Sequence, residues 1–464
     1  MLARARRGFV TAAAGCGKTD AIAAAVTASG DGRQLVLTHT HAGVKALRQR
    51  LQKYKAPKDR YHVDTLAGWA LNYAVHYPNL SRFKEAQPTG ASWSKVYDAA
   101  ERVLDSSAVR RVVTESYAGF YVDEYQDCTV GQHRLVLRMA DLLPCRILGD
   151  PLQGIFDFDQ QPPINWAADV ETNFERLPDL AHPWRWTGSS PDLGRRLMEI
   201  RAALLAGDEI DLQTPPLVWR PLSPEEEWRA CLDAARQDGS VVAIHKWAPS
   251  CHALAKKLRG RFTSMEQMES PDLLKWAKAI GWVEGTARAV QVIEFAAKCM
   301  TLVGTELGPL RDRMAQGALP DIGRVKKHRG VVQALLDVAG SGAFDPVLPA
   351  FEAIEQIPGR VLYRRELWRE IQRAVQLHIR TPGGSLPDAA WKVRNRTRHA
   401  GRAVEHRTIS RTLLVKGLEF DHVVVLNAAD HDAKNLYVAM TRASRSLTVL
   451  SKTPRIRLAR PSSP

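Results

Sequence analysis

Residues 12–19, Ala-Ala-Ala-Gly-Cys-Gly-Lys-Thr, have the composition of a loop that binds phosphate groups. Small side chains let successive backbone N–H groups wrap around phosphate oxygens, and a helix that follows points its positive end at them. The small residues are Ala14, Gly15, Cys16 and Gly17. Lys18 would reach the terminal phosphates, and the Thr19 hydroxyl would bind Mg²⁺. Although Ala12 stands where this pattern usually has glycine, the block predicts a nucleoside triphosphate site.

Two adjacent carboxylates, Asp123 and Glu124, follow a short apolar segment. Neighbouring carboxylates repel each other unless a cation or a catalytic task offsets the repulsion. Asp123 would hold Mg²⁺ through water, and Glu124 would orient or deprotonate the attacking water. Gln153, which follows Asp150 closely, would report the terminal phosphate because an amide both donates and accepts hydrogen bonds. These residue types indicate hydrolysis of the bound triphosphate.

The elements that must position these residues alternate between strand and helix in the first half of the chain, which is typical of a parallel sheet. We expect strands at residues 9–11, 34–38, 61–64, 120–122 and 146–148, and helices at 18–28 and 42–53. Asp123 and Asp150 then fall at the carboxyl ends of strands, where such sheets bind ligands. The sequence therefore predicts an α/β fold with the site at this edge.

The second half is expected to resume the sheet after a largely helical stretch. Apolar spacing predicts helices at residues 273–280, 286–303, 330–338 and 366–378, separated by Gly and Pro. Strands are expected at residues 240–245, 408–414, 422–426 and 447–450. The 464 residues exceed one compact core and indicate two to four folded units.

The composition favours a polyanionic partner and a reducing compartment. Sixty-five Lys and Arg against fifty Asp and Glu give a net charge of +15, which attracts nucleic acid. Six scattered cysteines without Cys-x-x-Cys spacing indicate neither a disulfide framework nor a zinc site, so a cytoplasmic location is expected. The basic start resembles a leader, but the first strand and the phosphate loop follow it directly, so cleavage there would destroy the site. No apolar run has the length needed to span a bilayer, and no membrane association is expected.

Four blocks together resemble the UvrD/Rep/PcrA type of superfamily 1 DNA helicase. They are residues 12–19 and 123–127, Val-Lys-Gly-Leu-Glu-Phe at 415–420, and Tyr-Val-Ala-Met-Thr-Arg-Ala at 437–443. The similarity covers residues 8–190 and 405–452. It implies an α/β fold with two RecA-like parallel-sheet motor domains of the P-loop NTPase type, each carrying a helical insertion. It also implies ATP as the nucleotide and Mg²⁺ as the metal.

The resemblance divides the chain as follows. The first RecA-like domain is expected at residues 1–175, with a short helical insertion at about 72–117. The second RecA-like domain is expected to combine residues 176–262 with 401–464, and residues 263–400 would form its helical insertion. The two insertions resemble the family in position only.

The same resemblance assigns further nucleotide contacts. Trp184 would stack on the adenine, Arg185 would bind a phosphate, Glu419 would contact the ribose, and Arg442 would contact the terminal phosphate. The chemistry agrees with the assignment of Arg442, since a permanently charged guanidinium stabilises a transferring phosphoryl group. In other nucleotide hydrolases this effect is worth on the order of a thousandfold in rate.

Contacts to single-stranded nucleic acid are assigned in the same way to the segments 38–41 and 64–66 and to one aromatic residue. The polar members are Thr38, His39, His41 and Thr65. Phe158 would stack on a base, and stacking contributes about 1 to 3 kcal/mol per base without sequence preference. Trp69 is a further stacking candidate, although an aromatic residue in this place can equally fill a core.

The sequence departs from the family pattern in three places. The glutamine-bearing segment that normally precedes the phosphate loop and reads adenine is missing. Either the start is truncated, or Trp184 holds the base by stacking alone, or base specificity is relaxed. Arg411 and Leu413 stand where the family often has Thr and His facing DNA. The first insertion is also too short to assume a strand-separating wedge.

The leading hypothesis is an ATP-driven translocase and helicase on single-stranded or tailed duplex DNA, moving 3′ to 5′ as the resemblance implies. RNA remains open as a substrate. A second hypothesis is a translocase that serves a repair, nuclease or defence protein without unwinding DNA. A nucleotide-gated clamp without hydrolysis is disfavoured because the catalytic residue types are all present, and a small-molecule kinase would have no use for the downstream blocks.

Overall fold

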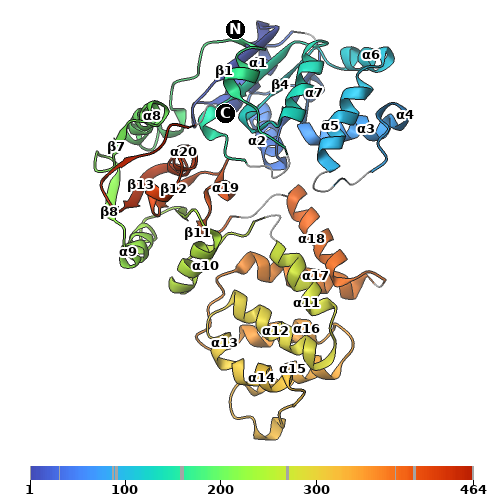
Figure 1. Ribbon diagram of the computed structural model, residues 1–464, viewed down its shortest axis with the longest axis vertical. Coiled ribbons are helices and arrows are strands. Elements are labelled where there is room, and N and C mark those ends of the chain that lie inside the picture. The colour runs from blue at the N-terminus through green and yellow to red at the C-terminus, as the bar shows by residue number, and fades with distance from the viewer. Residues whose placement is uncertain are drawn as a thin grey trace. The chain divides into compact units, whose positions relative to one another are not determined.

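The computed structural model describes residues 2–30, 32–85, 88, 92–156, 161–267, 271–381, 383–400 and 404–461. The chain divides into two compact units (Figure 1). The first unit comprises Met1–Pro221, Val415–Asp421 and Asn427–Pro464, and the second comprises Leu222–Leu414 and His422–Leu426. The first unit therefore joins the start of the chain to its end. The predicted boundaries of the RecA-like domains remain predictions.

A six-stranded parallel sheet forms the centre of the first unit, in the order β3-β2-β4-β5-β1-β6. Its strands are β1 (Arg7–Thr11), β2 (Gln34–Thr38), β3 (Tyr61–Thr65), β4 (Gly119–Val122), β5 (Cys145–Gly149) and β6 (Glu175–Arg176). The five strands predicted in this part of the chain are confirmed, whereas the short β6 was not expected.

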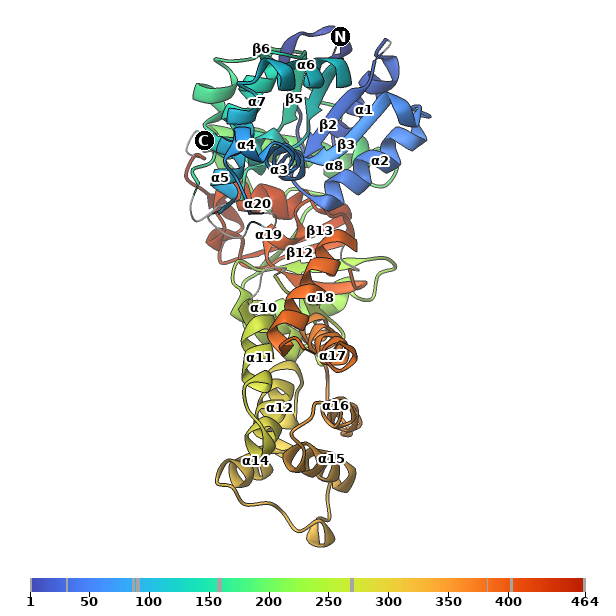
Figure 2. The same ribbon diagram turned by 90° about the vertical axis from the view of Figure 1, so that its right-hand side faces the viewer.

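Both faces of this sheet are covered by helices, because neighbouring residues of each strand point to opposite faces. Phe9 belongs to the core with α3, α5 and α7, whereas Val10 belongs to the core with α1 and α2. Figure 2 shows this layered arrangement from the side. The helices are α1 (Lys18–Ala28), α2 (His41–Lys53), α3 (Leu66–His76), α4 (Pro78–Ser81), α5 (Ser92–Val103), α6 (Ser107–Ser116) and α7 (Val130–Ala140).

Parallel pairing also joins the strands of the second half of the chain within each unit. In the second unit β10, β11, β9 and β12 are parallel neighbours, and in the first unit β13 pairs in parallel with β8. The strands are β8 (Val218–Pro221), β9 (Val241–Ile244), β10 (Thr263–Ser264), β11 (Arg407–Ser410), β12 (Phe420–Val425) and β13 (Ala443–Ser451). A separate antiparallel pair joins β7 (Glu209–Asp211) to β14 (Arg455–Arg457).

Helices of the second half include α8 (Pro191–Ala206), α9 (Pro224–Ala234), α10 (Ala248–Lys257) and α20 (Ala433–Met440). The predicted helical stretch is confirmed as a body built around Phe295, whose ring stacks on Trp368 at 5.2 Å between ring centroids. It contains α11 (Pro271–Gly281), α12 (Gly285–Cys299), α13 (Val303–Glu306), α14 (Gly308–Ala315), α15 (Arg329–Gly340), α16 (Val347–Glu355), α17 (Arg365–Arg380) and α18 (Leu386–Ala400).

Two sequence-based expectations are wrong. Residues 412–414 were expected to continue a strand, but β11 ends at Ser410 and Thr412–Val415 forms the short helix α19. Trp69 was a candidate for stacking on a base, but its side chain lies in the core of the first unit and packs on Tyr73 at 4.3 Å. An apolar residue pattern does not distinguish a short buried helix from a strand, or a core indole from a binding one. Among the described helices, none is long and apolar enough to cross a bilayer.

Candidate nucleotide site

The phosphate loop connects β1 to α1 at the carboxyl edge of the first sheet. Gly17, with φ +84°, lies in the left-handed region that favours glycine and leads into the first turn of α1. The Lys18 ammonium donates a hydrogen bond to the Ala12 carbonyl at 3.1 Å. Ala12 is fully buried, and its amide donates to Gly149 at 3.0 Å, so its additional methyl group fits within the core. The loop therefore accommodates alanine in place of the usual first glycine.

The segment Trp184–Trp186 lies directly against the two glycines of this loop. A Cβ atom at Gly15 would lie 2.7 Å from the Trp186 ring, and one at Gly17 would lie 3.2 Å from Trp184. The Trp184 side chain is 64% exposed, although it is a large apolar group. An exposed indole beside a phosphate loop is suitably placed to stack on a base that enters with the phosphates.

The predicted metal ligands meet at the end of β4. The Thr19 hydroxyl donates to the Asp123 carboxylate at 3.4 Å. Burial and the charge of Glu124 raise the pKa of Asp123 to about 7. Burial opposes ionisation of Glu124, but Lys18, Lys416 and the Gln126 amide outweigh it and lower its pKa to about 2. The pKa values of the two neighbouring carboxylates thus shift in opposite directions, and a cation bound here would favour the ionised form of Asp123.

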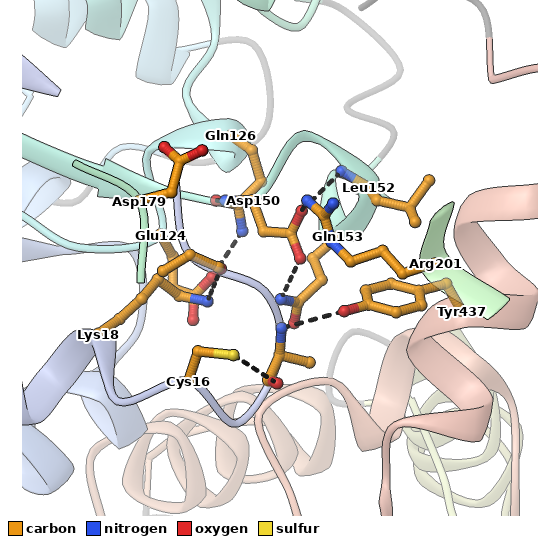
Figure 3. Close-up of polar contacts among 12 residues, drawn as sticks. Cys16, Lys18, Glu124, Gln126, Asp150, Leu152, Gln153, Asp179, Arg201 and Tyr437 are labelled. Atoms are coloured by element: carbon orange, nitrogen blue, oxygen red, sulfur yellow. Dashed lines mark hydrogen bonds and ion pairs between the residues drawn. The ribbon is translucent and has the colours of Figure 1, made fainter. Parts of the chain in front are cut away.

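Glu124 is held in an unfavourable backbone conformation and by a side-chain hydrogen bond. Its φ of +54° is strained for a residue with a side chain, and such strain is concentrated at functional sites. The Gln126 amide donates to the Glu124 carboxylate at 2.6 Å, and its oxygen accepts from the Asp150 backbone at 2.9 Å. Gln153 donates to the Asp150 carboxylate at 2.9 Å. Figure 3 shows these side chains together. The proposed water-orienting and phosphate-reporting groups therefore share one network.

Lys416 brings one of the downstream blocks into this network. Its ammonium forms an ion pair with Asp127, with 2.7 Å to Oδ2, and donates to the Gln153 carbonyl. It also lies 4.7 Å from the centre of the Phe156 ring. Burial raises the pKa of Asp127 to about 7, although Lys416 opposes the shift. Since both side chains are buried, this ion pair fixes the two segments against each other.

Arg185 bridges the other downstream segments. Its guanidinium donates to the Thr441 carbonyl and to the Glu419 carboxylate, each at 2.6 Å. Its backbone amide donates to Gly15 at 3.1 Å. The remaining Nε–H is buried without a hydrogen-bond partner among the described residues. The predicted phosphate-binding arginine and ribose-binding glutamate are thus brought together beside the phosphate loop.

Arg442 is almost completely buried, with 2% of its surface exposed. Its three side-chain nitrogens donate to Val438 O at 2.9 Å, Leu418 O at 3.1 Å and Thr441 Oγ1 at 3.0 Å. Burial, with the charge of Arg185, lowers its pKa, whereas the charge of Glu124 opposes that shift. The guanidinium is therefore close enough to interact electrostatically with Arg185 and Glu124, but its hydrogen bonds also make it part of the local structure.

Tyr437 connects the last helix to the phosphate loop. Its hydroxyl accepts a hydrogen bond from the Ala14 amide at 3.1 Å (Figure 3). Burial raises the pKa of the nearby Cys16 thiol to about 11, so this loop cysteine stays a neutral, unreactive group.

The predicted nucleic-acid residues lie mainly along one edge of the same sheet. Thr38 and Thr65 end the paired strands β2 and β3 side by side, and both are buried. Thr65 caps α3 by accepting from Gly68 at 2.9 Å. Burial and Lys416 lower the pKa of His39 to about 4, so its ring is neutral at pH 7. His41 begins α2 and is exposed, whereas Phe158 lies outside the described residues.

Several residues at the site had no role in the sequence analysis. Gln126, Asp127, Lys416 and Tyr437 all belong to the quoted blocks, so their position within a block was an available signal. Arg201, on α8, has no such signal and donates to the buried Asp150 at 2.7 Å. Residues that act through a neighbour are difficult to recognise from type and spacing alone.

The parallel sheet, the phosphate loop and the carboxylates at the strand ends define a P-loop NTPase fold. Residues 413–450 match the family model described as UvrD-like helicase C-terminal domain. This match confirms the predicted resemblance to UvrD-type superfamily 1 helicases and supports a nucleic-acid motor of the helicase or translocase class. Comparison with curated proteins gives no match.

Two solved helicase structures are similar to the chain. One is the DEAH/RHA helicase HrpB from Escherichia coli, with a TM-score of 0.36 and 9% identity, covering 97% of this chain and 41% of that chain. The other is Pif1 helicase from Candida albicans, with a TM-score of 0.40 and 10% identity, covering 97% of this chain and 91% of that one. The chain thus spans less than half the length of HrpB.

Proposed function

We propose that the protein is an ATP-dependent translocase and helicase on single-stranded DNA, moving 3′ to 5′. The observation that carries the proposal is the convergence of three distant segments on one phosphate loop. Arg185 and Glu419 pair beside Gly15, and Tyr437 binds the Ala14 amide. A small-molecule kinase would not need these contacts from distant segments on the far side of the nucleotide. A motor needs contacts that change as the nucleotide turns over.

The residues fit a magnesium-bound triphosphate. Thr19 and Asp123 would hold Mg²⁺, which would neutralise phosphate charge, and the amides of residues 15–19 would hold the phosphates. Glu124 would orient the attacking water, and Gln153 would report the terminal phosphate. Arg185 and Arg442 would bind developing phosphate charge, Glu419 would contact the ribose, and Trp184 would stack on the base.

Nucleic acid would follow the edge formed by the ends of β2 and β3. Thr38, His39, His41 and Thr65 supply polar and aromatic groups there, and Phe158 is proposed as the stacking residue. The net charge of +15 would draw the DNA backbone to the protein. The affinity for single-stranded DNA should therefore fall steeply with salt, and a flat salt titration would argue against backbone contacts.

One experiment tests the proposal directly. ATP hydrolysis is measured with and without single-stranded DNA, alongside displacement of duplexes that carry a 3′ or a 5′ tail. Lys18→Ala and Glu124→Gln should abolish hydrolysis while leaving the fold intact by circular dichroism. DNA-stimulated hydrolysis with displacement of 3′-tailed duplexes supports the helicase. Near-normal hydrolysis by both variants would remove the site assignment.

The second candidate is a translocase that serves a repair, nuclease or defence protein without unwinding DNA. It is favoured by the short helical insertion of the first sheet, in which α4 has only four residues. The same assay separates the two functions. DNA-stimulated hydrolysis without displacement of any tailed duplex, together with removal of streptavidin from biotinylated single strands, would identify the translocase.

A further inference from the structure

Arg201 is a partly buried charge that none of the sequence motifs includes. It lies on α8, and its Nη2 donates to Asp150 Oδ1 at 2.7 Å. The Asp150 side chain is 0% exposed, and that of Arg201 is 18% exposed. A carboxylate so deeply buried needs a close cation and hydrogen bonds to remain ionised. Arg201 and the amide of Leu152, which donates to Oδ1 at 3.2 Å, supply these contacts.

The ionised Asp150 determines the orientation of the Gln153 amide. Gln153 Nε2 donates to Asp150 Oδ2 at 2.9 Å. An ionised carboxylate can only accept hydrogen bonds, so only the NH₂ end of the amide can face it. The carbonyl oxygen and the second N–H of Gln153 then remain for other partners. A neutral amide or acid at position 150 would no longer impose this choice.

Arg201 also contacts the element that reaches the phosphate loop. Its guanidinium lies 5.9 Å from the centre of the Tyr437 ring, and the Tyr437 hydroxyl accepts from the Ala14 amide. The helix α20, which carries Tyr437, packs against both α8 and the turn Pro151–Gln153. One side chain therefore touches the carboxylate behind Gln153 and the tyrosine bound to the loop (Figure 3).

We propose that Arg201 is a positioning residue that keeps Asp150 as an obligate acceptor and thereby orients the Gln153 amide, whose carbonyl oxygen accepts from the reacting water and whose second N–H donates to the terminal phosphate. This inference rests on the proposed function, because it assigns Gln153 the phosphate-reporting role. It goes beyond that function in naming the residue that fixes the amide and the role of each end of the amide.

The competing explanation is that the ion pair of Arg201 only stabilises the fold. A KM-against-kcat comparison separates the two roles at a temperature well below the melting transition of every variant. Arg201→Met removes the charge at nearly constant length, Arg201→Lys keeps the charge, and Asp150→Asn removes the obligate acceptor. Arg195→Met is the matched control, because Arg195 lies on the same helix with a 70% exposed side chain that pairs with the surface residue Asp192.

Arg201→Met and Asp150→Asn should each lower kcat about a hundredfold with nearly unchanged KM, because misplacing one group disrupts a near-attack geometry. Arg201→Lys should recover about tenfold of the loss. Arg195→Met should match the wild type. A folded Arg201→Met protein with wild-type kcat would overturn the proposal, as would a loss that Arg201→Lys does not relieve.

A binding measurement distinguishes failure of this inference from failure of the proposed function. The affinities of the wild type and Arg201→Met for ADP and for a non-hydrolysable ATP analogue are compared by calorimetry. The preference for the ATP analogue over ADP should fall about tenfold in Arg201→Met, since a hydrogen bond to the terminal phosphate is lost. If the wild type hydrolysed no ATP, the proposed motor would fail, but this ratio would still decide the role of Arg201. An unchanged ratio overturns it.

Discussion

Arg442→Ala tests whether a guanidinium that the structure buries also takes part in hydrolysis. The substitution removes three hydrogen bonds, to the carbonyls of Val438 and Leu418 and to the Thr441 hydroxyl. At about 1 kcal/mol each, their loss should lower the free energy of unfolding by about 3 kcal/mol. In a unit of this size that corresponds to a fall of roughly 10 °C in the melting temperature.

The proposed catalytic role predicts a larger and separate effect. If Arg442 binds the terminal phosphate, its removal should lower kcat about a thousandfold, which corresponds to about 4 kcal/mol of transition-state stabilisation. Binding of single-stranded DNA should stay nearly unchanged. Hydrolysis is measured with saturating DNA at a temperature where thermal melting shows the variant to be folded, and DNA binding is measured by fluorescence anisotropy.

Arg445→Ala is a suitable control, because Arg445 is close in sequence but has a 55% exposed side chain that pairs with Asp421 at 3.0 Å. An exposed pair of this kind contributes about 1 kcal/mol or less. Arg445→Ala should leave both melting and turnover close to those of the wild type. If folded Arg442→Ala hydrolysed ATP at a near-normal rate, Arg442 would only hold the local structure. The proposal that Arg442 contacts the terminal phosphate would then be refuted.

Three further predictions follow from the electrostatics and exposure of the site. Because the pKa of Asp123 is raised to about 7, Mg²⁺ must displace a proton, and its activating concentration should be about tenfold higher at pH 6 than at pH 8 in a hydrolysis assay; no change would contradict the metal assignment. In the folded protein the pKa of His39 is lowered to about 4, whereas in the unfolded chain it is the ordinary 6.5. As the pH falls below 6.5, the unfolded chain therefore binds a proton that the folded protein does not, and the free energy of unfolding decreases. Wild type should lose about 2 kcal/mol more than His39→Gln between pH 7 and pH 5 in urea unfolding, and equal losses would disprove the shift. Trp184→Ala should raise the KM for ATP by roughly tenfold through lost stacking, whereas substitution of the similarly exposed Trp282, Trp282→Ala, should not; an unchanged KM would remove Trp184 from the base site.

The first sheet could be predicted closely because buried parallel strands have a strong local signal. Runs such as residues 35–37 are apolar, and the small residues before Lys18 mark the turn into a helix. The bounds of α1 at Lys18–Ala28 follow from these signals. Short elements were harder to place, since the four residues of α19 are too few to show a helical period.

The site was predictable where chemistry depends on residue type within a block, and not where it depends on packing between blocks. Asp123 and Thr19 could be paired because both belong to recognisable motifs, and their side chains meet. Arg201 could not be found, because its partner Asp150 is 51 residues away and an arginine on an amphipathic helix is ordinarily a surface residue. The failure at Trp69 has the same physical origin, since burial by distant helices decides whether an indole is exposed.

The ion pairs around the phosphate loop differ in how readily they can exchange partners. Lys416–Asp127 and Arg201–Asp150 are buried, and removing one partner from such a pair typically costs about 3 to 5 kcal/mol. The pair Arg185–Glu419 is different, because the Glu419 side chain is 56% exposed. Water can therefore replace Arg185 as its partner at a small cost in free energy. In the proposed function an incoming phosphate would therefore compete for Arg185, whose unpaired Nε–H is an additional donor. The two buried pairs would remain closed and hold the loops in place while that exchange occurs.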